Sequence, residues 1–160
     1  MRATYLLPIA DREPLAWIVR EQRTAFGEHR AREAERLKPD DVLLLYTTRG
    51  CFRNPTRDRG RVIGRATVTA PVTRLADAVV FGTREFPYLV ELRIESLAPP
   101  REGVALAPLV ERLRETFPDA ATWSARMRRA LVPVTSADAR LLERELDRVA
   151  APYPEAVSSY

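Results

Sequence analysis

The strongest chemical signal in the sequence is a group of arginines between residues 49 and 65. This stretch holds six arginines and one acid, Asp58, so its formal charge is +5. A guanidinium group presents paired N–H donors that match phosphate oxygens, and several together attract a polyanion. An arginine-rich loop that is merely solvated is the alternative. The predicted phosphate-binding residues in this stretch are Arg49, Arg53, Arg57, Arg59 and Arg61.

A second group of arginines lies nearer the carboxyl end, where Arg126, Arg128 and Arg129 follow Trp123. Aromatic faces stack on nucleobases while arginines contact phosphates, so this combination is typical of nucleic-acid binding. Tyr46 lies close to the first group of arginines in the same manner. For Trp123 and for Tyr46, a core position with the polar atom satisfied is the alternative.

The residue types argue against catalysis. One histidine, His29, and one cysteine, Cys51, exclude an intrachain disulfide and any metal site built from several His and Cys ligands. The only lysine, Lys38, has no glycine-rich loop before it, which excludes a P-loop. A dyad of Cys51 with His29 lacks any local signature. We expect no catalytic residue, no metal and no cofactor; a small hydrolase or nuclease is the alternative.

Length and composition fit one domain. The chain has 160 residues, a formal charge of +4 and 46% hydrophobic residues, enough for a single core. No apolar run approaches the roughly 20 residues that cross a bilayer, and the amino terminus has no signal-peptide core. We expect a cytoplasmic protein without membrane contact, with one domain over residues 1–150. Residues 151–160 contain two prolines and no apolar period, which predicts a frayed tail.

The hydrophobic pattern predicts both strands and helices. Strands or extended segments are predicted over residues 4–9, 42–48, 61–69, 86–95 and 130–134. Helices are predicted over residues 12–23, 28–37, 106–117 and 136–149, of which 106–117 has the clearest apolar stripe. The first arginine group then falls in the connection between two neighbouring strands. Because helices do not alternate regularly with strands, the pattern favours an α+β fold over a doubly wound sheet.

Three segments together resemble the EVE domains, which belong to the PUA-like superfamily with the YTH and ASCH domains. The first is Leu-Lys-Pro-Asp-Asp at residues 37–41, which leads into a strand ending in Tyr-Thr-Thr at 46–48. The second is Val-Ile-Gly-Arg-Ala-Thr-Val at 62–68, and the third is Pro-Val-Thr at 133–135. Their order and spacing agree with the family over nearly the whole chain.

The resemblance implies a PUA-like curved or closed β-barrel of about five to six strands, decorated by helices. It also implies a non-catalytic module that binds DNA or RNA and holds a modified base, such as a modified cytosine, in a pocket. Thr47 and Thr48 stand where the family usually has His and Ser. A protein-interaction module with an acidic partner is a further alternative. With Trp123 added for its place beside arginines, the expected pocket residues are Tyr46, Thr47, Thr48, Tyr5, Phe26 and Trp123.

Overall fold

The computed structural model describes residues 2–53 and 59–160. Its centre is strand β3 (Val42–Thr47), in which all six residues are buried. The strand pairs in parallel with β1 (Thr4–Ile9) and antiparallel with β4 (Arg61–Val68). A continuous apolar run with covered faces is typical of such a central strand, and the prediction of a buried strand here is confirmed.

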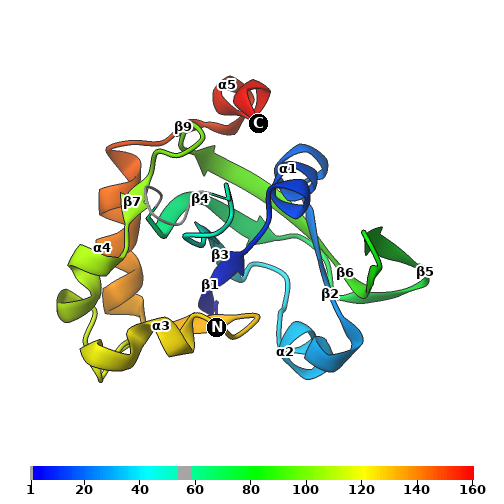
Figure 1. Cartoon of the computed structure of the whole chain (residues 1–160), viewed down its shortest axis with the longest axis horizontal. Coiled ribbons are helices and arrows are strands. Elements are labelled where there is room, and N and C mark those ends of the chain that lie inside the picture. Colours follow the sequence, from blue (N-terminus) through cyan, green and yellow to red (C-terminus); the bar gives the residue numbers. More distant parts are fainter. Residues whose placement is uncertain (1, 54–58) are drawn as a thin grey trace.

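The described residues form one nine-stranded sheet that curls into a partly closed barrel (Figure 1). Its main path runs in the order β2-β6-β4-β3-β1-β8. The strands not yet given are β2 (Arg23–Phe26), β5 (Thr73–Phe81), β6 (Arg84–Leu97), β7 (Val104–Ala105), β8 (Val132–Val134) and β9 (Ala151–Pro152). The expected α+β class and curved barrel are confirmed. The strand number exceeds the expected five to six because β5 and several short strands gave no clear sequence pattern.

The sheet separates two hydrophobic clusters, and helices cover both of its faces. Helix α1 (Arg12–Glu21) and the short α2 (Ala31–Glu35) pack on the first cluster, and α4 (Ser136–Asp147) packs on the second. The remaining helices are α3 (Trp123–Arg126), α5 (Tyr153–Ala156) and the 3-10 helices η1 (Glu28–Arg30), η2 (Ala107–Arg112), η3 (Ala120–Thr122) and η4 (Val157–Ser159). None of the helices within residues 2–53 and 59–160 is long and apolar enough to cross a membrane.

The prediction of a regular helix over residues 106–117 is wrong. Only η2 is helical there, and Leu106 and Leu113 are nevertheless fully buried. The amide of Leu109 donates to the carbonyl of Leu106, three residues earlier. Pro108 lacks an amide donor, and the tighter 3-10 turn keeps the same apolar side chains on the core.

Residues 23 and 151–160 also depart from the prediction. Helix α1 ends at Glu21, its C-cap residue Gln22 has φ of 53°, and Arg23 starts strand β2. The tail is not frayed. Strand β9 pairs with β6, and the Tyr160 hydroxyl donates to the carbonyl of Ala98 at 2.6 Å. These tertiary contacts hold a segment that has no apolar period of its own.

Candidate functional site

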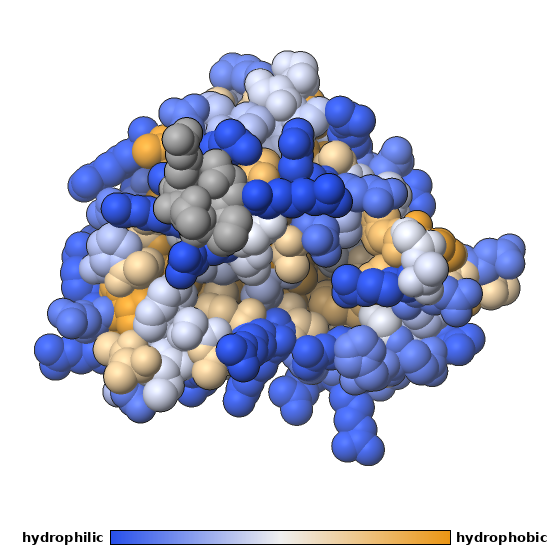
Figure 2. Space-filling view, in the orientation of Figure 1, coloured by the Kyte–Doolittle hydropathy of each residue, from blue (hydrophilic) through white to orange (hydrophobic). Residues whose placement is uncertain are grey.

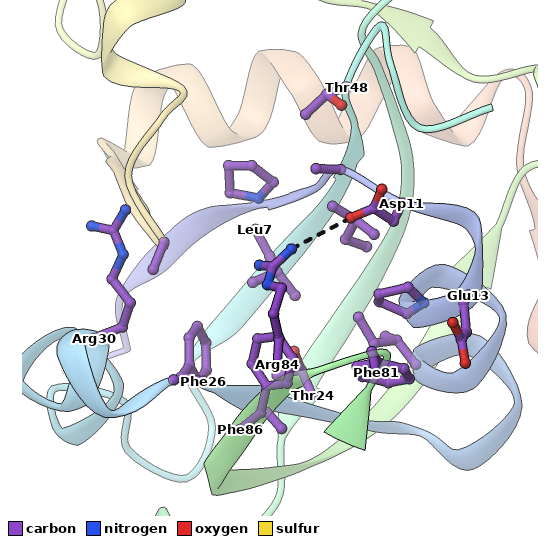
Figure 3. Close-up of a pocket in the computed structure, with 18 of the residues that line it drawn as sticks. Leu7, Asp11, Glu13, Thr24, Phe26, Arg30, Thr48, Phe81, Arg84 and Phe86 are labelled. Atoms are coloured by element: carbon purple, nitrogen blue, oxygen red, sulfur yellow. Dashed lines mark ion pairs between the residues drawn. The ribbon is translucent and has the colours of Figure 1, made fainter. Parts of the chain in front are cut away.

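A cavity of about 860 Å³ opens where strands β1 and β3 end. Because these strands are parallel, their carboxyl ends meet at one edge of the sheet. The Thr48 amide, just beyond β3, donates to the Ile9 carbonyl at 3.0 Å and extends the ladder to the cavity. The other walls come from α1, β2, the β5–β6 hairpin and residues 127–130 (Figure 3). Clefts beyond the carboxyl ends of parallel strands are frequent ligand sites.

One wall of the cavity is aromatic. Trp17 of α1 meets Phe81 of β5 edge to face, with ring centroids 5.7 Å apart and an interplanar angle of 76°. Phe81 in turn lies 5.6 Å from Phe86 of β6. All three rings are half-buried, while Phe26 of β2, which also lines the cavity, is buried. Half-buried rings leave apolar faces on which a planar ligand can stack.

The rim of the cavity is basic. Six arginines line it, together with two carboxylates, which leaves an excess of four positive charges. Figure 2 shows hydrophilic residues around a hollow whose floor is apolar. The charged lining residues are Arg12, Arg30, Arg53, Arg84, Arg128, Arg129, Asp11 and Glu13. His29 lies among them and is exposed.

Two of these arginines already have protein partners. Arg84 lies 3.8 Å from the Asp11 carboxylate across the cavity mouth, and its guanidinium is 5.3 Å from the Phe86 ring centroid (Figure 3). Arg30 donates to the Glu33 carboxylate at 3.0 Å. Asp11 is also the N-cap residue of α1, but its side chain makes no capping hydrogen bond.

The other four lining arginines make neither an ion pair nor a side-chain hydrogen bond within the described part of the chain. All four are exposed. They come from three separate places in the sequence and are Arg12, Arg53, Arg128 and Arg129. Free guanidinium groups around an aromatic wall can bind the phosphates of a ligand whose ring enters the cavity.

The expected pocket residues divide between the cavity and the core. Thr48 and Phe26 line the cavity. Tyr46 does not, because it is 3% exposed and packs in the second cluster, on the opposite face of β3 from Leu45. A Cβ placed on Gly60 would lie 1.7 Å from the Tyr46 hydroxyl oxygen, so the phenol fills the space beside that glycine. Burial raises the pKa of Tyr46 to about 12.

The remaining three expected pocket residues also lie outside the cavity lining. Thr47 is 1% exposed. Trp123 packs edge to face on Phe117, with centroids 6.1 Å apart, and belongs to the second cluster. Tyr5 packs, half-buried, against the first cluster. The core alternative describes the buried Tyr46, whereas Trp123 is half-buried and packs against the second cluster.

The expected phosphate-binding residues divide in the same way. Arg53 and the pair Arg128 and Arg129 reach the cavity together. The others that the structure describes are not among its lining residues: Arg49, Arg59, Arg61 and Arg126. Arg61 donates to the Gly103 carbonyl at 3.4 Å, and Arg57 lies outside the described residues.

The sequence did not indicate the three rings of the aromatic wall, nor three of the six arginines that line the cavity, which are Arg12, Arg30 and Arg84. Trp17 lies within a predicted helix, where the apolar pattern does not distinguish a residue that lines a cavity from one in the core. Phe81 and Phe86 flank Gly82, whose φ of 64° is typical of a hairpin turn. A hairpin signal at this glycine could have placed both rings on one projecting ribbon.

Groups that could act as nucleophiles or metal ligands are dispersed. Cys51 is completely buried, whereas His29 is exposed at the cavity. No three His, Cys, Asp or Glu side chains are grouped as a metal site in the regions that the structure describes.

Comparison with known proteins relates this arrangement to solved structures. No protein-family model matches the chain, and no curated protein matches it. Among solved structures, a Pseudomonas syringae protein superposes with a TM-score of 0.61 and 13% identity, covering 90% of this chain and 100% of its own. A hypothetical protein of Leishmania major gives 0.59 and 13%, with 92% and 96% covered.

The YTH domain of Mmi1, solved in complex with RNA, gives a TM-score of 0.60 and 9% identity over 92% of this chain and 82% of that one. Identities this low establish the fold alone. The chain therefore shares the fold of this YTH domain.

Proposed function

We propose that the protein is a non-catalytic module that binds single-stranded RNA and takes one base into the cavity beyond β1 and β3. One observation carries this proposal. The same cavity is lined by three half-buried rings and by four arginines whose side chains have no ion pair or hydrogen bond in the described part of the chain. Phosphate contacts supply affinity without sequence information, and the ring faces hold a base by stacking.

The choice of RNA rests on the YTH domain of Mmi1, which has this fold and was solved in complex with RNA. Recognition of RNA generally uses unpaired bases that stack on aromatic side chains. Single-stranded DNA offers the same chemistry without the 2′-hydroxyl, so it serves as the comparison ligand in the test.

We also propose membership of the EVE family and a modified base as the preferred ligand. The three EVE-like segments include β4 and β8 and the approach to β3, so they all belong to the sheet. Beside the rings, Thr24, Thr48 and Asp11 offer hydroxyl or carboxylate groups to the edge of a base. Moving a base out of a duplex into a pocket costs a few kcal/mol of free energy, and this cost is smallest when the base is already unpaired.

Fluorescence anisotropy with labelled oligonucleotides tests the ligand. The probes are matched single strands of RNA and DNA with cytosine, 5-methylcytosine or 5-hydroxymethylcytosine at one position, and tRNA. We expect single-stranded RNA to bind most tightly, with a preference for one modified base, and affinity to fall steeply with salt. Negligible binding to every probe would overturn the proposal, and a preference for DNA would overturn the choice of RNA.

Tryptophan fluorescence tests the site, because Trp17 lies in the cavity wall, whereas Trp123 lies outside the cavity lining and packs against the second cluster. In the Trp123→Phe variant, Trp17 is the only tryptophan, and stacking of a base should quench its emission. In the Trp17→Phe variant, Trp123 remains against Phe117 and its emission should not respond to RNA. Quenching of Trp123 alone would place the ligand elsewhere.

The absence of catalysis is part of the proposal. Complete burial of Cys51 speaks against its use as a nucleophile, since a reactive thiolate needs access to substrate. Incubation of end-labelled RNA and DNA with Mg²⁺ or Mn²⁺ should leave both intact. Turnover that disappears in the His29→Ala variant would instead favour the hydrolase alternative.

A further inference from the structure

Helix α2 is attached to the arginine-bearing segment 127–131 by a pair of charged residues. One Glu33 carboxylate oxygen accepts from Arg30 at 3.0 Å, and the other accepts from the Leu131 amide at 3.1 Å. The second terminal nitrogen of Arg30 donates to the Arg128 carbonyl at 3.1 Å. Both contacts to the segment span 98 residues of sequence. Figure 3 shows Arg30 rising from this helical region at one side of the cavity.

These contacts fix both ends of a short stretch of backbone. The Arg128 carbonyl and the Leu131 amide bracket Arg129, while Leu131 is 4% exposed in the first cluster. Ala34, beside Glu33 on α2, is completely buried, so the helix itself is anchored to the core. A guanidinium that bonds a carboxylate and a carbonyl at once imposes geometry as well as charge.

We propose that Glu33 is a positioning residue for RNA binding: through Arg30 and the Leu131 amide, it holds the segment from which Arg128 and Arg129 reach the cavity. The inference rests on the proposed function of that cavity. It assigns a favourable role to an acidic residue beside an anion-binding rim. Fixing the segment in advance lowers the ordering cost that the two exposed arginines would otherwise add to binding.

The sign of the effect separates positioning from simple electrostatics. If Glu33 acted only through its charge, Glu33→Gln would raise RNA affinity, because a negative charge near phosphate is removed. If it positions the segment, the same change lowers affinity, because the amide has one acceptor oxygen in place of two. We expect a loss of about fivefold, in the range of coupling energies between residues of one hydrogen-bond network.

Two further variants complete the experiment. Glu35→Gln makes the same charge change on the same helix, at an exposed residue with no hydrogen bond or ion pair in the described structure, and should leave affinity equal or slightly higher. Arg30→Lys keeps the positive charge but cannot bond Glu33 and Arg128 in the same fork geometry, and should lower affinity. Denaturation in urea confirms that each variant is folded under the binding conditions.

A double-mutant cycle in the full chain then identifies the route. Glu33→Gln should have no further effect once Arg128 and Arg129 are both alanine, and the Leu131 amide should exchange faster in Glu33→Gln than in the wild type. Higher affinity in Glu33→Gln, or an undiminished effect in the double-alanine background, overturns the inference. If the wild type binds no RNA, the proposed function fails first, which keeps the two failures distinct.

Discussion

The two faces of the sheet contain similar residues in opposite situations. On the covered face, Phe117 and Tyr46 are buried with residues of α4 in the second cluster. On the open face, Trp17 and Phe86 lie half-buried at a cavity ringed by arginines. An aromatic residue near arginines in sequence is thus not enough to predict a binding site. The ring must also keep an uncovered face, and the arginines must lack protein partners.

Coverage of each face by its connecting segments explains the difference. Residues 106–117 and α4 bury the second cluster, in which Phe117 is 1% and Leu142 is 0% exposed. On the open face, α1 meets the β5–β6 hairpin through Trp17 and Phe81, and the cavity lies between these elements and the ends of β1 and β3. The same curled sheet therefore carries a hydrophobic core on each face, and the ligand-sized space lies beside the first cluster at the ends of β1 and β3.

The largest effect should come from opening the covered face. Phe117→Ala removes a fully buried ring that Trp123 contacts edge to face, and should lower the free energy of unfolding by about 3–5 kcal/mol. Urea denaturation measures this loss. RNA affinity of the protein that remains folded should stay within about twofold of the wild type. A large loss of affinity in folded Phe117→Ala would show that the two faces are not separate in function.

Phe86→Ala tests the open face in the converse way. Removing a half-buried ring of the aromatic wall should weaken RNA binding about tenfold to hundredfold, the range expected for loss of one base-stacking contact. The free energy of unfolding should fall by less than in Phe117→Ala, because the Phe86 ring is already partly exposed. Anisotropy titrations and urea denaturation of both variants give the comparison. Equal affinity in Phe86→Ala and the wild type would remove this wall from the site.

Substitutions of single arginines should change RNA affinity less than Phe86→Ala does, and they compare an arginine that lines the cavity with one that does not. Arg128→Ala should lower RNA affinity about threefold and reduce the slope of log affinity against log salt by roughly one. Arg126→Ala is the matched control, since Arg126 belongs to the same basic group but does not line the cavity. Titrations at several salt concentrations measure both slopes. A similar change in Arg126→Ala would mean that total charge, not position at the cavity, governs binding.

The smallest effect at neutral pH concerns Tyr46 on the covered face. Burial raises its pKa from 10.0 to about 12, so folding favours the neutral phenol. Its contribution to stability is complete below about pH 10 and is lost as pH rises from about 10 to 12. Urea denaturation between pH 8 and pH 12 should show a shallower decline for Tyr46→Phe than for the wild type. An identical decline would mean that this phenol does not titrate with unfolding.

Local patterns predicted the central elements well. Strands β1, β3 and β4 follow from short apolar runs with clear boundaries. Helix α4 begins at Ser136, directly after its N-cap Thr135, whose hydroxyl accepts a hydrogen bond from the Asp138 amide. The stripe at 106–117 correctly predicted buried side chains and wrongly predicted a helix. Periodicity reports which residues face the core, and 3-10 and α-helical turns can bury the same set.

The candidate site was less predictable than the fold. Thr48, Phe26, Arg53, Arg128 and Arg129 were expected at a nucleic-acid site and line the cavity. The alternation of side chains along β3 turns Tyr46 toward the covered face. The sequence did not indicate which face would remain open, because that depends on segments that follow much later in the chain.

By itself, the sequence determined the kind of chemistry available, because the chain is rich in arginine and has one lysine, one cysteine and one histidine. It also determined the central strand of the sheet, through the apolar run of residues 42–46. Only the tertiary structure decided which arginines meet one another and which rings keep an exposed face. Arg53 and Arg128 come from distant segments, and the Glu33 and Arg30 contacts that hold the second segment close a loop of 98 residues. Local secondary-structure propensity carries no information about such contacts between distant segments. They are fixed by strand pairing and by the segments that pack on each face of the sheet.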